Sequence, residues 1–294
     1  MRLVVTGREG QVVRSLMERA KGRAEVVALG RPALDLARPE TIAPALADAR
    51  PDIVVSAAAY TAVDQAEDEP ERAFAVNATG AGAVAEAAAR LGVPVIHLST
   101  DYVFDGTKEH PYSEEDAPAP RSVYGASKLA GEEAVAAANP DHVILRTAWV
   151  YSPFGKNFVK TMLALAQTRD HLRVVDDQHG NPSAAHDIAE AVLAIVETWR
   201  RRAERHPRGV YHFAGSGETS WCGLARHALA VSRAAGGPHA EVEAITTAEY
   251  PTRAARPRNS RLDCRRFRAD FGYLAPEWQT SLEAVVKRLL AEGV

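Results

Sequence analysis

MRLVVTGREGQVV, residues 1–13, combines a short apolar run, a turn that contains glycine and the start of a helical segment. Residues 2–5 predict a strand and residues 11–20 predict a helix. Glycine accepts positive φ and lets a ligand approach the backbone, and a helix N-terminus offers free N–H groups to phosphate. The stretch therefore predicts the first unit of a dinucleotide-binding fold. The predicted contacts in this stretch are Gly7, Gly10, Gln11 and Val12.

The glycine spacing does not settle this prediction by itself. The turn reads G-x-x-G, and Val13 stands where a third glycine often occurs. An ordinary strand–turn–helix would use the same glycines for geometry alone. The position of the turn, directly after the first strand of the chain, favours the phosphate-binding interpretation.

The alternation of strands and helices continues through the first half of the chain. The further predicted strands cover residues 25–29, 53–56, 93–98 and 143–146, and the further predicted helices cover residues 39–49, 71–91 and 123–138. Strands that alternate with helices and are apolar throughout are typical of a parallel sheet covered on both faces. We expect an α/β fold with a Rossmann-like, doubly wound parallel sheet.

The second half of the chain is less regular and predicts a smaller C-terminal substrate-binding α/β domain. Residues 172–175 and 210–213 could be strands, and residues 184–200 and 224–233 could be helices. We expect the dinucleotide-binding domain at residues 1–151 plus about 172–214, and the substrate domain at about 152–171 plus 215–294. Seven arginines lie between residues 253 and 268, where they could hold a diphosphate or form a solvated face.

Length and composition limit the other classes of protein. At roughly 100–200 residues per domain, 294 residues fit one large domain or two small ones. The net charge of −3 gives no basic field for nucleic acid, and no apolar run is long enough for a membrane helix. Two cysteines, Cys222 and Cys264, favour a reducing compartment. We expect a cytoplasmic protein without a nucleic-acid or membrane partner.

The predicted chemistry lies after the fourth strand. The strand ends at Leu98-Ser99-Thr100, and Tyr124 and Lys128 follow at i and i+4 on one helix face. An ammonium beside a phenol favours the phenolate, so Lys128 is expected to lower the pKa of Tyr124. Thr100 lies at the carboxyl end of a parallel strand, where such folds place ligands. Tyr124, Lys128 and Thr100 are the predicted catalytic residues.

At these residues the sequence resembles the extended short-chain dehydrogenases/reductases and, within them, the dTDP-4-dehydrorhamnose reductase family. The resemblance covers the chain from the first strand to the last quarter. The stretches that carry it are GREGQV (7–12), AAAYTAVD (57–64), LSTDYVFDG (98–106), VYGASKLAGE (123–132), RTAWVY (146–151) and RPRNSRL (256–262).

The resemblance implies a reaction and a role for each site residue. NAD(P)H would reduce the C4 ketone of dTDP-4-dehydro-β-L-rhamnose to dTDP-β-L-rhamnose, the final step of dTDP-L-rhamnose biosynthesis. Tyr124 would donate the proton, Lys128 would hold the nicotinamide ribose, and Thr100 would bond the C4 oxygen. The other residues implied in substrate binding are Asp101 and Trp149. The residues implied in lining the cofactor are Ala58, Ala59, Tyr60, Thr61 and Leu98.

The end of the second strand bears on the choice between cofactors. An acidic residue there binds the ribose 2′-OH of NAD, whereas an arginine suits the 2′-phosphate of NADP. Arg31 stands at this point and Arg8 lies in the glycine turn, which favours NADPH over NADH. Asp35 and Leu36 are the next predicted cofactor contacts.

Several alternatives remain open at the level of sequence. Nucleotide-sugar epimerases and dehydratases of the same superfamily share the Tyr–Lys pair, but dehydratases place Glu where this chain has Tyr102. The non-catalytic regulatory subunit of methionine adenosyltransferase also looks similar. Mg²⁺-bridged homodimers occur among rhamnose reductases, but Ser15 stands where the first-helix carboxylate is expected. A homodimer remains an expectation, and His97 is expected to be a satisfied core residue.

Overall fold

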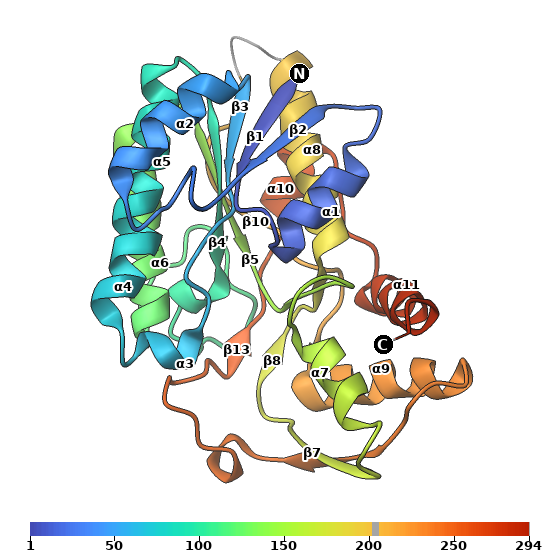
Figure 1. The fold of residues 1–294 in the computed structure, drawn as a ribbon. Coiled ribbons are helices and arrows are strands. Elements are labelled where there is room, and N and C mark those ends of the chain that lie inside the picture. Colours follow the sequence, from blue (N-terminus) through green and yellow to red (C-terminus); the bar gives the residue numbers. More distant parts are fainter. Residues whose placement is uncertain (202–205, 294) are drawn as a thin grey trace.

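Six parallel strands form the central sheet of the computed structural model, which describes residues 1–201 and 206–293 (Figure 1). The sheet order is β10-β5-β4-β3-β1-β2, and every neighbouring pair is parallel. This arrangement confirms the predicted doubly wound α/β fold. The strands are β1 (Arg2–Thr6), β2 (Glu25–Leu29), β3 (Ile53–Ser56), β4 (Val95–Thr100), β5 (His142–Thr147) and β10 (Gly209–His212).

Helices cover both faces of this sheet, and each face has its own apolar core (Figure 1). One face packs against α1 (Gln11–Arg19) and α8 (Ala185–Arg201), and the other packs against α2 (Ile42–Ala49), α5 (Ala81–Arg90) and α6 (Val123–Ala138). Because both faces are covered, the strands are apolar throughout instead of alternating.

The helix expected at residues 71–91 is helical throughout but changes its hydrogen-bonding pattern. It consists of α4 (Pro70–Phe74), the π-helical turn η2 (Ala75–Gly80) and α5. Gly80 lies so close to Leu36 that a Cβ would overlap the Leu36 carbonyl oxygen. The π-turn carries Asn77, which is buried. Such turns often occur at functional sites, and this one places Asn77 beside the loop that follows β3.

A smaller set of short elements forms the second domain, below the sheet in Figure 1. Its apolar core joins α7, α9 and α11 to β7. The helices are α7 (Phe158–Leu165), α9 (Trp221–Ala234) and α11 (Trp278–Ala291). The strands are β6 (Val150–Tyr151), β7 (His171–Val175), β8 (His179–Gly180), β9 (Ser183–Ala184), β11 (Thr219–Ser220), β12 (Glu241–Ile245) and β13 (Asn259–Ser260).

The predicted return of the chain to the first domain near Leu172 is wrong. β7 pairs with β12, and Leu172 and Val174 belong to the smaller core. The chain returns to the first domain at α8 instead. The prediction failed because an apolar run indicates a strand but not the sheet that it joins. Conversely, α10 (Arg265–Phe271) falls within the predicted substrate domain but places Phe267 and Phe271 in the core of the large sheet. Residues 202–205 and 294, within the predicted domain ranges, lie outside the described residues.

Two further findings bear on the composition of the chain. In the described residues, no helix is both long enough and apolar enough to cross a membrane. Cys222 and Cys264 are free thiols, so the structure contains no bridge between them.

Candidate active site

Helix α6 carries both members of the predicted Tyr–Lys pair. Its first turn is capped by Ser122, whose Oγ accepts a hydrogen bond from the Gly125 N–H at 3.1 Å. Two glycines let the helix pack closely: a Cβ at Gly125 would overlap the Tyr102 carbonyl oxygen, and one at Gly131 would overlap the Asn77 carbonyl oxygen. The helix therefore lies against the end of β4, which carries Thr100.

Tyr124 and Thr100 meet at the carboxyl end of β4. Their side chains lie close together, and burial of the Tyr124 hydroxyl raises its pKa above the ordinary value of 10.0. The nearby Thr100 hydroxyl lowers this pKa, but the effect of burial is larger. The net pKa of Tyr124 is thus raised, and the lowering predicted from its neighbour Lys128 is not the dominant effect. The phenol stays protonated at neutral pH, as a proton donor must be.

Lys128 is buried directly behind this pair. Its Nζ donates hydrogen bonds to the Leu98 carbonyl oxygen at 2.7 Å and to Nε2 of His97 at 3.3 Å. Burial lowers the pKa of Lys128 to about 8, although the nearby Glu132 raises it. Lys128 therefore still carries its charge at neutral pH.

Asp101 is the most unusual carboxylate of the site. It is 4% exposed, and its Oδ1 accepts a hydrogen bond from the Thr100 hydroxyl at 3.1 Å. Among the described residues, its Oδ2 has no hydrogen-bond partner. Burial raises the pKa of Asp101 to about 6, against the hydroxyls of Ser260 and Thr100, which lower it. A buried carboxylate with a free oxygen is suited to accept a hydroxyl of a ligand.

The turn after β1 fits the diphosphate of a dinucleotide. Gly7 has a φ of 96°, and Gly10 caps α1 without a side-chain hydrogen bond, which leaves the first N–H groups of the helix free. A Cβ at Gly7 would lie 3.5 Å from both the Ala58 Cβ and Val13. Val13 thus fills the place of a third glycine, while the backbone at Gly7 stays open to a ligand. This chain therefore retains the features that a phosphate cradle needs.

The side chain of Gln11 does not face the predicted diphosphate site but binds the segment after β6. Its Oε1 accepts hydrogen bonds from the Ser152 hydroxyl at 2.8 Å and from Nδ2 of Asn157 at 3.1 Å. Gln11 therefore ties the start of α1 to the segment that leaves the first domain. Only its backbone N–H remains for the predicted diphosphate contact, together with that of Val12.

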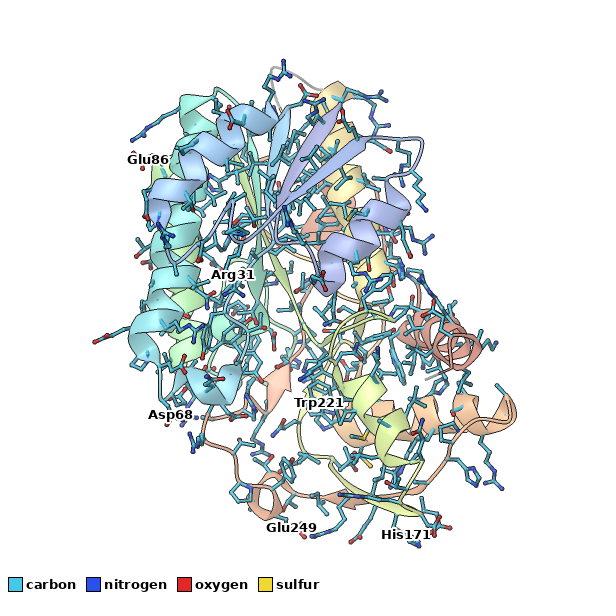
Figure 2. All side chains as sticks on the ribbon, viewed as in Figure 1. Arg31, Asp68, Glu86, His171, Trp221 and Glu249 are labelled. Carbon is cyan, nitrogen blue, oxygen red and sulfur yellow. The ribbon has the colours of Figure 1, made fainter. Side chains whose placement is uncertain are left out.

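The two arginines that favour NADPH lie at the end of β2. Arg31 is exposed, and the Arg8 side chain packs over Gly30, where a Cβ would lie 3.2 Å from Arg8 Cγ (Figure 2). The next residues are less available. Asp35 Oδ1 accepts the Ala37 N–H at 3.0 Å, and the Leu36 side chain is buried in the core.

The loop after β3 is held from two sides. The Thr6 hydroxyl accepts the N–H groups of Ala57 and Ala58, each at 3.0 Å. Asn77 accepts the Tyr60 N–H at 2.8 Å and donates to the Tyr60 carbonyl at 3.0 Å. The rest of the predicted cofactor-lining loop, Ala59 and Thr61, flanks this contact. Sequence reasoning missed Asn77, and the helix in which it lies gave no reason to select it.

Trp149 belongs to an aromatic pair that sequence reasoning also missed. It has a φ of 49°, and its ring stacks on Trp221 with centroids 3.6 Å apart. Gly180 lies against the Trp149 ring, so that a Cβ there would overlap it. Trp221 follows Trp149 by 72 positions in the sequence, and no local pattern links the two.

A buried ion pair lies behind the catalytic strand. Arg146 donates to Glu132 at 2.7 Å, and both side chains are 4% exposed. The Ser99 hydroxyl donates to Glu132 at 2.5 Å, and Nε2 of His212 lies 3.5 Å from Arg146. The group connects β4, α6, β5 and β10. Its four members are dispersed in sequence, and none belongs to a motif that predicts the contact.

The arginine-rich segment is mostly engaged with its own protein. Arg256 pairs with Asp64 at 2.5 Å and also donates to the Tyr102 hydroxyl at 3.5 Å. Asp64 lies in α3 (Val63–Ala66), so this contact ties the segment to the first domain. The further partners are Asp68 for Arg253, Glu218 for Arg261, Asp263 for Arg265 and the Tyr211 ring for Arg266. These contacts favour a structural role over diphosphate binding.

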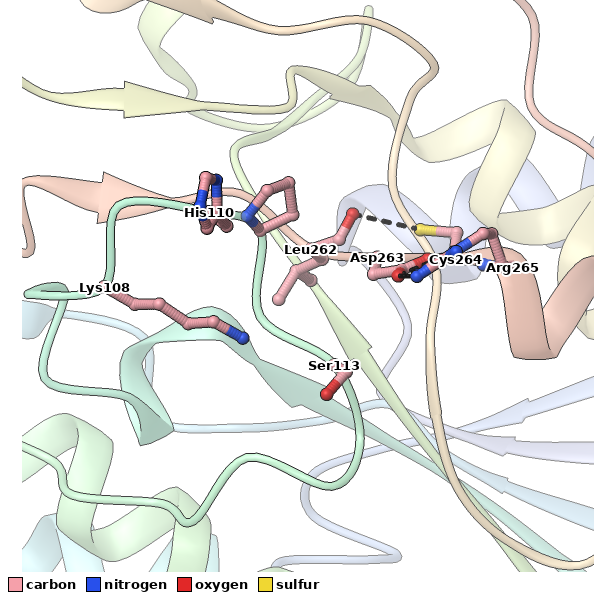
Figure 3. Close-up of a pocket in the computed structure, with 8 residues that line it drawn as sticks. Lys108, His110, Ser113, Leu262, Asp263, Cys264 and Arg265 are labelled. Carbon is pink, nitrogen blue, oxygen red and sulfur yellow. Dashed lines mark hydrogen bonds and ion pairs between the residues drawn. The ribbon is translucent and has the colours of Figure 1, made fainter.

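A cavity of about 600 Å³ lies apart from the catalytic residues (Figure 3). Lys108 and Arg265 contribute positive charge to its lining, but they pair with Asp116 at 2.6 Å and with Asp263 at 2.5 Å. None of the predicted site residues lines it. The cavity therefore adds nothing to the catalytic geometry.

Comparison with known proteins agrees with this geometry. A family model described as the RmlD substrate binding domain matches residues 1–291. A dTDP-4-dehydrorhamnose reductase of Sinorhizobium fredii is 54% identical over 293 residues, which cover 100% of this chain and 99% of that protein. The chain belongs to the dTDP-4-dehydrorhamnose reductase family. The resemblance seen in the sequence is thus confirmed.

Solved structures show that this family member also shares the family's architecture. The dTDP-4-dehydrorhamnose reductase of Clostridium acetobutylicum superimposes with a TM-score of 0.92 at 35% identity, covering 99% of this chain and 100% of the other. That of Bacillus anthracis, solved in complex with NADP, gives a TM-score of 0.90 at 33% identity, covering 98% and 99%. These relatives favour the reductase over the epimerase, dehydratase and regulatory-subunit alternatives.

Proposed function

We propose that this chain reduces the C4 ketone of dTDP-4-dehydro-β-L-rhamnose to dTDP-β-L-rhamnose with NAD(P)H, the final step of dTDP-L-rhamnose biosynthesis. The observation that carries the proposal is the meeting of Thr100, Tyr124 and Lys128 at the end of β4. The family relationship identifies the substrate class on which such a site acts.

Three residues of the site have separate roles in proton transfer. Tyr124 keeps its proton at neutral pH, so it can give that proton to an oxygen that is gaining negative charge. Thr100, which lies beside Tyr124, orients the same oxygen, and the charge of Lys128 stabilises it. The cofactor, when bound, supplies the hydride. Asp101 and Trp149 are the proposed sugar contacts.

The cofactor would lie along the first three strand ends. Gly7, Gly10 and the backbone of Gln11 and Val12 would hold the diphosphate, and Lys128 the nicotinamide ribose. The other proposed contacts are Arg31, Asp35, Leu36, Ala58, Ala59, Tyr60, Thr61 and Leu98. For Leu36 the contact would be through the backbone, since its side chain is in the core.

NADPH is the proposed cofactor, with NADH as the alternative, because Arg31 and Arg8 place two positive charges at the end of β2. Arg31→Asp should weaken NADPH binding about tenfold or more while changing NADH binding little, since a hydrogen bond to a charged group is worth about 1.5–3 kcal/mol. Fluorescence titration with each cofactor measures both constants. An equal loss for both would refute the 2′-phosphate argument.

The reaction itself is tested by absorbance at 340 nm with dTDP-4-dehydro-L-rhamnose and either cofactor. Loss of absorbance with an equal amount of dTDP-L-rhamnose formed is the expected result. A folded protein that binds the cofactor but leaves it unoxidised would overturn the proposed substrate.

Three further properties stay predictions. A cytoplasmic location and a homodimer are expected, and light scattering would measure the second. For Mg²⁺ the residues offer little support, because Ser15 is fully buried and the described residues contain no cluster of three or more His, Cys, Asp or Glu that could bind a metal.

A further inference from the structure

His97 is a fully enclosed histidine in the middle of β4, with 1% of its surface exposed. Both ring nitrogens have partners: Nε2 lies 3.3 Å from Lys128 Nζ, and Nδ1 lies 3.1 Å from the Ser56 hydroxyl. In the sheet, His97 is flanked by Ser56 of β3 and Ile144 of β5. The ring thus forms the link between the central sheet and the catalytic lysine.

The chemistry of these partners fixes the state of the ring. An ammonium group can only donate, so Nε2 must accept from Lys128, and Nδ1 must carry the proton and donate to Ser56. Burial lowers the pKa of His97 well below its ordinary value, and the charge of Lys128 lowers it further. His97 is therefore a neutral acceptor of defined tautomer at neutral pH.

Lys128 depends on this acceptor. Its ammonium has three N–H bonds, and its hydrogen-bond partners in the described residues are two neutral groups, the Leu98 carbonyl and His97. A buried charge needs such partners, because water no longer solvates it. With two N–H bonds engaged by these groups, the third is left for a ligand at the carboxyl end of β4.

We propose that His97 is a positioning residue for Lys128: oriented by Ser56, it holds the ammonium group charged and in place for the cofactor ribose and for Tyr124. The proposal rests on the function proposed above for Lys128. A residue that merely fills the core would need only the right volume, whereas a positioning residue needs an acceptor at the site of Nε2.

Two isosteric substitutions separate these roles. Gln places its carbonyl oxygen near the position of Nε2, and Asn places its polar atoms near Nδ1. His97→Gln therefore keeps the acceptor for Lys128, while His97→Asn keeps only the contact with Ser56. If His97 merely fills the core, the two variants should behave alike.

The first readout is the affinity for NADPH as a function of pH, measured by fluorescence titration without substrate. His97→Asn should weaken NADPH binding about ten- to a hundredfold at pH 8, the range for a hydrogen bond to a charged group. It should also move the alkaline loss of affinity to lower pH, because the ammonium form of Lys128 loses an acceptor while Glu132 still acts on it. His97→Gln should stay within about threefold of the wild type.

The second readout is turnover with the keto sugar. kcat of His97→Asn should fall with the same shift in pH profile, and KM for the sugar should change little. The matched control is His212, which is also buried in the sheet but contacts Arg146 and not Lys128. Asn and Gln at position 212 should change the melting temperature without separating in NADPH affinity.

Equal NADPH affinities of the Asn and Gln variants at all pH values would overturn the proposal. If neither variant folds, ¹⁵N NMR of wild-type His97 decides: a ring protonated at Nδ1 and constant from pH 6 to 8 supports it, and a proton at Nε2 or a titration in this range refutes it. A wild type that binds NADPH but does not reduce the sugar would refute the proposed substrate alone, since the binding comparison still decides the role of His97.

Discussion

The two sides of the active site are built in different ways. The cofactor side uses the ends of long parallel strands, the start of α1 and one face of α6, and buried hydrogen bonds hold its catalytic groups. The substrate side uses loops and two-residue strands, with the stacked pair Trp149–Trp221 and with Arg256, whose partly exposed ion pair with Asp64 reaches the first domain. The catalytic groups thus rest on long regular elements, while the substrate side is built from loops and short strands.

The largest expected effect removes the proton donor from the cofactor side. Tyr124→Phe should lower kcat about 10²- to 10⁴-fold, the usual contribution of a general acid, while NADPH affinity changes little. Steady-state assays at 340 nm and fluorescence titration measure the two quantities. Tyr112→Phe, which removes a hydroxyl bonded to Asp105 at 2.7 Å, is the matched control and should keep kcat. Retained turnover in Tyr124→Phe would take Tyr124 out of the acid role.

The same contrast explains what could be predicted from sequence. Helix α6 spans residues 123–138, as predicted, because a serine cap and a run of helix-forming residues are local properties. The Tyr–Lys pair followed from spacing within that helix. The partners of β7, Trp149 and Arg256 did not follow, since each contact joins residues far apart in the chain. The raised pKa of Tyr124 was also missed, because burial is a property of the assembled site.

The next prediction compares the ion pairs of the two sides. Arg146→Met leaves Glu132 as an unpaired buried charge, which should cost about 3–5 kcal/mol in the free energy of unfolding. Arg253→Met, which breaks an exposed pair between the arginine segment and Asp68, should cost less than about 1 kcal/mol. Urea unfolding of both variants measures the difference. Similar losses would contradict the argument that burial makes the Arg146–Glu132 pair the more important of the two.

The next prediction concerns Asp101, a proposed sugar contact whose charged form should lower the free energy of unfolding. Its pKa of about 6 lies above the ordinary value of 3.8, so the folded state binds more protons than the unfolded state between these values. Stability from this group is therefore present at low pH and is lost as pH rises through about 6. Asp101→Asn, which has no such loss, should be more stable than the wild type at pH 7 by about 1–3 kcal/mol.

Urea unfolding from pH 4 to 8 tests this sign. The advantage of Asp101→Asn should disappear towards pH 4, and its kcat/KM for the sugar should fall. Asp105 is the opposite case, because the Thr107 N–H and the Tyr112 and Thr107 hydroxyls hold its pKa below the ordinary value. Asp105→Asn should therefore be less stable than the wild type at pH 7, with a difference that shrinks in acid. A destabilised Asp101→Asn at pH 7 would contradict the argument.

The smallest effect is expected at the contact that joins the two sides. Arg256 pairs with Asp64 of α3 and touches the Tyr102 hydroxyl, and the ring of Tyr102 packs edge-on against Tyr124 at 5.5 Å. The pair is partly exposed, so Arg256→Gln should cost less than about 1 kcal/mol in stability. If the arginine segment belongs to the substrate side, KM for the sugar nucleotide should rise a few-fold and NADPH affinity should stay constant. A change in NADPH affinity instead would make Asp64, Arg256 and Tyr102 part of the cofactor side, and the boundary between the two sides would then run through the arginine segment.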